Sequence, residues 1–317
     1  MNRAYKIAFG LAFAAIAVPG MAHAAGFDVE TATRAYLDTL QGPARAKSDA
    51  YFEGGYWLIL WGALVSILTD ALLLRFRLTA TFREWAEARS KRASVIVWLT
   101  ALAYTIAGTV LTFPWALYTA FFRERQYGLM NQAFGGWFGD YLTNVAIALV
   151  IMPLLVTAVY SVIRRFPKNW WLLGTGVFAA FMGVGVLIAP VYIAPLFNTY
   201  TELPAGPVRE RIVAMAKANN VPAEHIYLFD ASKQTKRISA NVSGIGPTIR
   251  ISLNDNLLNR TSETETAAVM GHELGHYVLG HVMQLLAGFT LLAALALFLV
   301  SRIAPVLIAR YGAPPRC

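Results

Sequence analysis

Two histidines and a glutamate lie close together in the segment Gly271-His272-Glu273-Leu274-Gly275-His276. Residues four apart on an α-helix differ by about 40° in direction, so His272 and His276 would project from one face of a helix, one turn apart. Two imidazoles placed in this way can hold one Zn²⁺ ion at about 2.0–2.1 Å. Glu273 is then placed to act on the metal-bound water rather than on the metal. The pattern predicts a zinc peptidase, in which Glu273 is the general base that takes a proton from the water as it attacks a peptide carbonyl.

The same spacing also arises by chance on helices that bind no metal, so the surrounding segments have to support it. Ser262-Glu263-Thr264-Glu265 matches a capping box, which would begin the helix that carries the motif. A predicted strand over 248–253 precedes that helix and could offer an edge to an extended peptide. This context favours the zinc site over incidental histidines.

A catalytic zinc site normally has three protein ligands and one water. No Asp or Glu follows Glu273, which leaves His281 as the later candidate. His281 lies five residues past His276, so we expect it about 180° around the helix from His272, and it also misses the metzincin spacing. We therefore expect His281 to be a polar residue near the membrane surface, and the third ligand to be absent from this chain.

The composition places much of the chain in lipid. Only 14% of the 317 residues are charged, whereas soluble domains carry about a quarter. The formal net charge of +9 comes mainly from basic residues in short loops beside apolar runs, and there is no recognised nucleic-acid-binding motif, so we expect no nucleic-acid partner. Cys317 is the only cysteine, which excludes an intrachain disulfide and a cysteine-based zinc site.

The first 24 residues resemble an export signal. Arg3 and Lys6 precede an apolar core over 7–18, and Ala22-His23-Ala24 fits a small-x-small cleavage site. The alternative is an uncleaved first membrane helix, although the apolar core is short for a span of about 20 residues.

Five apolar runs are long enough to cross about 30 Å of hydrocarbon. They cover about 56–74, 95–120, 141–163, 170–193 and 284–309. The sequence thus predicts a mainly α fold, a polytopic transmembrane helical bundle. We assign 25–196 to an N-terminal membrane domain with four transmembrane helices, and 284–317 to a further transmembrane helix and tail.

Between 197 and 283 charged residues return and the elements become shorter. A helix is predicted over 207–220, with Pro207 in its first turn. Strands are predicted over 226–229, 238–242 and 248–253. This insert is therefore a small α+β metallopeptidase region, made of the zinc-motif helix and short edge strands.

Several stretches beyond the zinc motif resemble the integral-membrane CAAX prenyl protease type I family, in a bacterial form. They are Tyr127–Gln132, Trp137–Asp140, Pro195–Asn198, Asp230–Lys233, Ser239–Gly244, Ile251–Leu258 and Ala268–His276. The likeness covers nearly the whole chain after about residue 45. It implies a membrane chamber of helices with the zinc site inside, and peptide or protein substrates.

The resemblance also implies that Asn241, with Ala240 beside it, lies on an edge strand and binds the substrate backbone. The family usually has Asn-Ala-Tyr here, whereas this chain has Asn241-Val242-Ser243, which leaves the side-chain preference near the scissile bond open. The alternative for Asn241 is a strand-end residue that caps its own backbone.

In the family the third zinc ligand is a glutamate well downstream, beyond a further membrane helix. Because this chain ends without one, we expect a form truncated or shifted in frame near residue 312, which binds zinc weakly and cleaves little.

The basic loops 75–94 and 164–169 should be cytoplasmic by the positive-inside rule. Counting crossings then places the 197–283 insert on the periplasmic side of a bacterial inner membrane. The expected function is that of a membrane-bound zinc endopeptidase. The alternative is a non-catalytic membrane protein, either a scaffold or transporter-like, with a vestigial metal site and with Asp70 as the main intramembrane charge.

Overall fold

The computed structural model describes residues 28–311, so the predicted signal segment and Cys317 lie outside it. By its internal contacts the chain divides into two units, one up to Gly55 and one from Tyr56 on. The described part of the first unit holds α1 (Val29–Leu37) and the beginning of α2 (Gly42–Arg75). Asp28 caps α1 by accepting a hydrogen bond from the backbone N–H of Glu30 at 3.1 Å.

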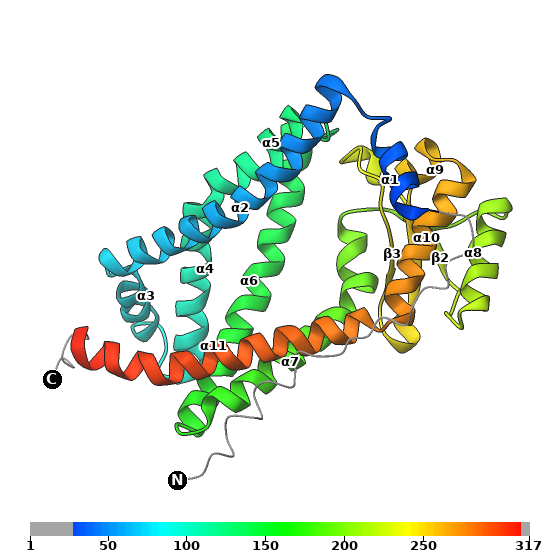
Figure 1. Ribbon diagram of the computed structural model, residues 1–317. Helices are drawn as coiled ribbons and strands as arrows, with labels where there is room; N and C mark the ends of the chain where they lie inside the picture. Colours follow the sequence, from blue (N-terminus) through cyan, green and yellow to red (C-terminus); the bar gives the residue numbers. More distant parts are fainter. Residues whose placement is uncertain (1–27, 312–317) are drawn as a thin grey trace, which may run out of the picture. The chain divides into compact units, whose positions relative to one another are not determined.

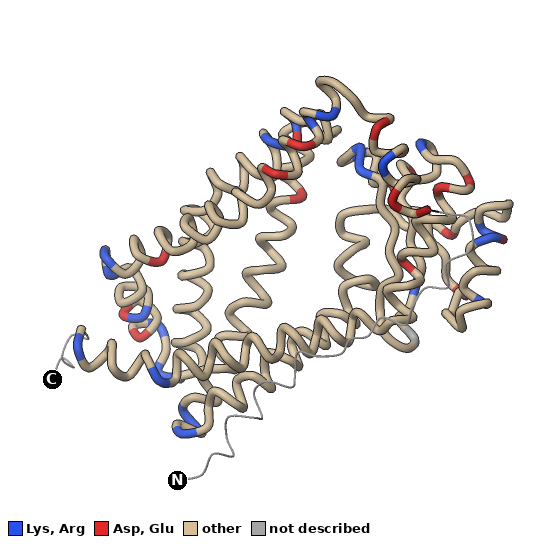
Figure 2. Tube along the Cα trace, in the orientation of Figure 1, with Lys and Arg blue, Asp and Glu red and all other residues tan. Residues whose placement is uncertain are grey.

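Five helices in the described part of the chain are long and apolar enough to cross a membrane. They are α2; α4 (Ala93–Leu117), continued to Gln126 by a π-helical segment and α5 (Arg123–Gln126); α6 (Phe134–Arg165); α7 (Trp170–Ile188), continued to Leu196 by short π and 3-10 segments; and α11 (His281–Tyr311). All five predicted runs fall inside these helices, which confirms the membrane fold. Few residues in these apolar windows are buried within the protein, and charged residues gather mostly towards the helix ends (Figure 2).

The membrane helices pack in chain order. The short helix α3 (Leu78–Glu87) packs on α4, α4 on α6, α6 on α7, and α7 on α11 (Figure 1). An aromatic cluster joins α4 to α6 close to the loop between them, where Phe113 contacts Trp137, Phe138 and Tyr141 with ring centroids 5.3 to 6.4 Å apart. These ring contacts pack α4 against the first turns of α6.

A four-stranded sheet follows the fourth membrane helix. Its strands are β1 (Tyr200–Glu202), β2 (Ile226–Phe229), β3 (Ala240–Ser243) and β4 (Arg250–Asn254), in the spatial order β1-β2-β4-β3. β2 and β4 are parallel, and the two outer pairs are antiparallel. The predicted strands over 226–229, 238–242 and 248–253 are confirmed within two residues.

The expectation that the 248–253 strand offers a substrate-binding edge is wrong. β4 lies between β2 and β3, so both of its edges already carry ladder hydrogen bonds. Its side chains Ile251 and Leu253 are fully buried, which is typical of an interior strand. Within the residues described, the edge beside the zinc-motif helix belongs to β3.

The core of this region lies between the sheet and two helices, α8 (Pro207–Ala218) and α10 (Glu263–Val278). Its fully buried members include Ile212, Ala216, Ile251, Leu253, Leu257 and Met270. The predicted capping box is confirmed: Ser262 Oγ accepts from the Glu265 N–H at 3.3 Å, and Glu265 Oε2 accepts from the Ser262 N–H at 2.8 Å. Between β4 and α10, α9 (Asp255–Arg260) is capped by Asn254.

Candidate metal centre

Helix α10 divides into a core face and a functional face. Thr266, Met270 and Leu274, spaced by four residues, are buried against the sheet and α8. His272 and His276 project from the other side, about 200° around the helix from Met270 and Leu274 respectively, and are exposed. The packing that holds the helix therefore leaves both imidazoles free to bind.

The two imidazoles point their Nε2 atoms at one another. The Nε2 atoms of His272 and His276 are 3.0 Å apart, and the rings are nearly perpendicular, with centroids 4.6 Å apart. Two nitrogens bound tetrahedrally to one Zn²⁺ at 2.0–2.1 Å would be separated by about 3.3 Å. The pair therefore fits a shared zinc ion with a shift of a few tenths of an ångström. Glu273, the next residue along the helix, is half-buried beside them.

His281 lies closer to this pair than the sequence predicted. The helix ends at Val278, and Gly280 has a φ of +66°, which turns the chain into α11. His281 is the first residue of α11, and its Nδ1 lies 2.6 Å from Nδ1 of His276. The predicted direction was wrong because it assumed a continuous helix, and Gly280 is the sequence signal that could have corrected it.

The third ligand position is not filled in this part of the chain. Across residues 28–311, no group of three or more His, Cys, Asp or Glu side chains is arranged to hold a metal ion. His281 approaches the Nδ1 side of His276, away from the Nε2 atoms that face one another.

Strand β3 contacts α10 and presents an edge without a strand partner among the described residues. The N–H of Asn254 donates to the carbonyl of Ser239, which makes this a hydrogen-bonded pair of the antiparallel ladder. By alternation, Asn241 and Ser243 also bond to β4, whereas the backbone groups of Ala240 and Val242 point towards the open edge.

The two predicted substrate-binding residues therefore differ in what they can contribute. Ala240 is only 9% exposed and its side chain belongs to the core, so it can offer only its backbone to a ligand. The side chain of Asn241 projects from the opposite face of the strand and is half-buried.

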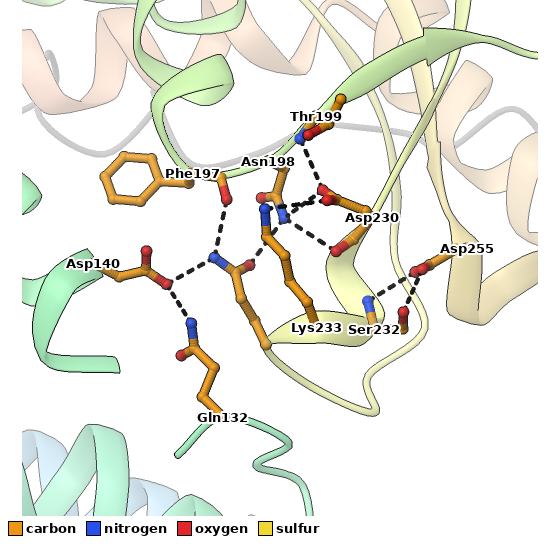
Figure 3. A network of polar contacts seen from close by, with 10 residues as sticks. Gln132, Asp140, Phe197, Asn198, Thr199, Asp230, Ser232, Lys233 and Asp255 are labelled. Carbon is orange, nitrogen blue, oxygen red and sulfur yellow. Dashed lines mark hydrogen bonds and ion pairs between the residues drawn. The ribbon is translucent and has the colours of Figure 1, made fainter. Parts of the chain in front are cut away.

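A polar network, which sequence reasoning did not predict, surrounds the segment that leads into β3 (Figure 3). Asp230 accepts from the Thr199 N–H at 2.8 Å and lies 3.1 Å from Lys233 Nζ, and Asn198 lies 3.4 Å away. Burial raises the pKa of Asp230, but the hydrogen bonds from Thr199, Lys233 and Asn198 together outweigh it, so the net pKa is below the ordinary value of 3.8.

The network also reaches the membrane helices. Asp140 of α6 accepts from the side-chain amides of Gln132 and Gln234 through one oxygen, at 2.7 and 2.8 Å (Figure 3). Nearby, Asn131 Nδ2 donates to the carbonyl of Ser232 at 2.7 Å. These contacts tie the loop between α5 and α6 to the 230–237 segment. The stretches that carried the family resemblance contain most of these residues.

A separate hollow of about 1030 Å³ lies between α2, α3, α4 and α6. Asp70, the intramembrane charge noted in the sequence, lines it and accepts a hydrogen bond from the Tyr104 hydroxyl. None of the zinc-motif residues lines this hollow, so it forms no part of the candidate metal centre.

Two family models match the chain. The N-terminal model of the CAAX prenyl proteases, described as five membrane helices, matches residues 34–199, and the model of peptidase family M48 matches residues 202–312. The first of these alone spans more than half of the chain.

The chain is also similar to named proteins. It is 30% identical to the uncharacterized metalloprotease YhfN of Bacillus subtilis, over 81% of this chain and 60% of the relative. It is 27% identical to a CAAX prenyl protease 1 homolog of Oryza sativa, over 69% of this chain and 53% of the relative. The crystal structure of Ste24p from S. mikatae has the same fold, with a TM-score of 0.70, 20% identity, and coverage of 86% of this chain and 70% of that one.

The chain thus spans between half and three fifths of the length of these two curated relatives. The family models, the similarity to the Bacillus subtilis protein and the shared fold agree with one another. This multi-pass membrane protein belongs to the CAAX prenyl protease type I family.

Proposed function

We propose that this chain forms the catalytic part of a membrane zinc endopeptidase. The observation that carries the proposal is the pair of exposed imidazoles whose Nε2 atoms lie 3.0 Å apart on one face of α10. Membership of a metalloprotease family supports the same conclusion. His272 and His276 would hold the ion, and a bound zinc ion would lower the pKa of a water and polarise a substrate carbonyl.

Glu273 is the residue we assign to proton transfer. It follows the first ligand on the helix and is half-buried, next to the position where a water would lie. Its carboxylate accepts a proton from the water as the water attacks the peptide carbonyl, and then passes it to the leaving nitrogen. His272 and His276 would hold the ion, so neither of them would be available for this role.

The substrate would bind as an added strand on β3. The backbone groups of Ala240 and Val242 that point to the open edge would pair with an extended peptide. Asn241 would add a side-chain hydrogen bond to the peptide backbone. Alternate residues of an extended peptide in this position would pair their N–H and C=O groups with the strand, so each peptide bond would keep one of its two polar groups facing away from the ladder.

Replacing Glu273 by Gln tests the mechanism. We expect the rate of peptide hydrolysis to fall by about 10²- to 10⁴-fold, because a general base is lost, while zinc content is unchanged. Glu263→Gln is the matched control, since it makes the same chemical change in the first turn of the same helix and should leave the rate unchanged. Hydrolysis by the Glu273→Gln protein at the original rate would refute the assignment.

The zinc site has its own test. The purified protein should bind Zn²⁺, and both the His272→Ala and the His276→Ala variants should lose this binding. Competition with a chelator measures the affinity of each protein. Zinc retained by both variants would show that these residues are not the ligands.

We further propose that residues 197–283, the proposed catalytic region, lie on the periplasmic side of an inner membrane. Arg164 Nη1 lies 3.4 Å from the Ala93 carbonyl, so the ends of the two basic loops are neighbours, which supports placing both on one side as the positive-inside rule expects. The hydrogen bond between Asn131 and Ser232 keeps the α5–α6 loop with the catalytic region, as the crossing count requires. A reporter fused after Asn220 that is active only in the cytoplasm would refute this topology.

The second candidate is a non-catalytic, transporter-like membrane protein. Asp70 facing a hollow of about 1030 Å³ among the membrane helices is the observation that favours it. The Glu273→Gln experiment separates the two candidates, because only in the endopeptidase would the rate of peptide hydrolysis depend on the Glu273 carboxylate.

A further inference from the structure

We propose that His281 is a positioning residue for the metal centre: it accepts a hydrogen bond from Nδ1 of His276 and thereby fixes the orientation and tautomer of that ligand. The inference rests on the proposed zinc site at His272 and His276. It is carried by three imidazoles in a row, joined by nitrogen distances of 3.0 and 2.6 Å.

The two nitrogens of His276 face different partners. Its Nε2 lies 3.0 Å from Nε2 of His272, whereas its Nδ1 lies 2.6 Å from Nδ1 of His281. An ion shared by the first pair lies on the Nε2 side of the ring, and His281 lies on the other side. His281 is therefore placed to orient a ligand, and it is not placed to bind the same ion.

The proton positions follow from the chemistry of imidazole. A histidine that binds a metal through Nε2 is neutral and carries its hydrogen on Nδ1. His276 must therefore donate across the 2.6 Å contact, and Nδ1 of His281 must accept. His281 then carries its own hydrogen on Nε2. Metal-binding histidines generally have such a partner on their second nitrogen, which fixes the ring and raises its basicity.

The backbone holds His281 in this position. Gly280 has a φ of +66°, a conformation that favours glycine, and its carbonyl accepts from the N–H groups of Met283 and Gln284 at 3.0 and 3.1 Å. The side-chain amide of Gln284 also donates to the carbonyl of Leu279 at 2.9 Å. His281 thus begins α11 from a turn that is fixed on both sides.

Substitutions of His281 distinguish orientation from ligation. The side-chain oxygen of Asn can occupy the place of imidazole Nδ1, whereas that of Gln reaches the place of Nε2. Because the contact to His276 is made through Nδ1, His281→Asn should keep the acceptor and His281→Ala and His281→Gln should lose it. His225→Asn is the control, since His225 is exposed and packs on Tyr227 rather than on the metal centre.

The measurements are the Zn²⁺ dissociation constant, from competition with a chelator, and the visible absorption of the Co²⁺-substituted protein. We expect a 10- to 100-fold weaker zinc affinity for His281→Ala and His281→Gln, which is the usual cost of losing such a partner. The zinc affinity of His281→Asn should stay within about threefold of the unmodified protein, because this variant keeps the hydrogen-bond acceptor for His276. Its Co²⁺ spectrum should be unshifted, because the metal ligands themselves are unchanged.

Three outcomes would overturn the inference, and they differ from one another. An unchanged affinity in His281→Ala, with loss in His272→Ala and His276→Ala, would leave the zinc site standing and remove the role of His281. An equal loss in His281→Asn and His281→Ala, with a changed Co²⁺ spectrum in both, would make His281 a ligand. Zinc affinity unaffected in every histidine variant would refute the proposed zinc site and this inference with it.

Discussion

The residues proposed for catalysis can be substituted without removing the contacts that stabilise helix α10. His272 and His276 are exposed, whereas the stability of α10 comes from Met270 and Leu274 on its other face and from its capping box. Substitutions on the functional face therefore leave no cavity in the core. Loss of zinc binding or activity in such variants reports on chemistry rather than on unfolding.

Asp230 gives a prediction on pH dependence. Its pKa is lowered in the folded protein, so its contribution to stability is present at neutral pH and is lost as the pH falls through 3.8 and below. Asp230→Asn should therefore lower the unfolding temperature at pH 7 and flatten its dependence on pH below about 4. Thermal unfolding in detergent between pH 3 and 7 measures this.

The control for that experiment is Asp38→Asn, at an exposed position at the end of α1, outside the catalytic region in the sequence. Its profile should follow that of the unmodified protein. If Asp230→Asn and Asp38→Asn gave the same profile, the hydrogen bonds to Asp230 would have no net effect on stability.

Sequence reasoning predicted that His272 and His276 share one face of a helix, but it placed His281 on the wrong side. The pair depends on local geometry, since a spacing of four residues within one helix fixes the direction of both side chains. The position of His281 depends on where that helix ends, and Gly280 decides it through a left-handed backbone conformation. The spacing of 100° per residue therefore cannot be applied to residues on both sides of such a glycine, because the helix axis changes direction there.

At the scale of elements, three of the four strands were predictable, but β1 and the order of the strands were not. Alternation and turn residues identify β2, β3 and β4 one by one. Their pairing is non-local: β2 pairs with β4 in parallel, across the segment that holds β3. Only the three-dimensional arrangement therefore shows that β3, and not β4, is at the edge beside α10.

The open edge of β3 gives the second prediction. Proline at position 242 would remove the N–H that points to the open edge while leaving the bonds of β3 to β4 in place. We expect Val242→Pro to lower kcat/KM about 5- to 10-fold, the effect of losing one hydrogen bond worth about 1 to 1.4 kcal/mol. Peptide hydrolysis by protein with measured zinc content checks it.

Val242→Ala is the control, because it removes the half-buried side chain and keeps the N–H. The difference between the two variants then isolates the backbone donor. Equal kcat/KM values for Val242→Pro and Val242→Ala would exclude substrate pairing at this position.

At the scale of the molecule, the membrane helices and the catalytic region are joined by specific polar contacts. The Glu124 carboxylate accepts two bonds from Arg237, each at 2.8 Å, and the Lys236 N–H donates to the carbonyl of Leu129 at 2.9 Å. Apolar runs and a positive-inside count predict which helices cross a membrane, but they carry no information on which loop contacts which turn. These contacts join polar groups of two segments that are distant in the sequence, and neither segment has a periodic pattern that would reveal them.

Asp140 gives the prediction for this joint. One of its oxygens accepts from Gln132 and from Gln234, so Asp140→Ala would leave two amide donors without that partner. We expect Asp140→Ala and Gln234→Ala each to lower the free energy of unfolding by about 1–2 kcal/mol, and the double variant to lose less than their sum, by at least about 0.5 kcal/mol. Equilibrium unfolding in mixed micelles measures all three.

Asp140→Ala combined with Glu263→Ala is the control cycle. Glu263 shares no partner with Asp140 and pairs instead with Arg211 at 3.8 Å, so the effects of these two substitutions should add. If the Asp140 and Gln234 effects were additive as well, the hydrogen bond between the membrane helices and the catalytic region would contribute nothing to holding them together.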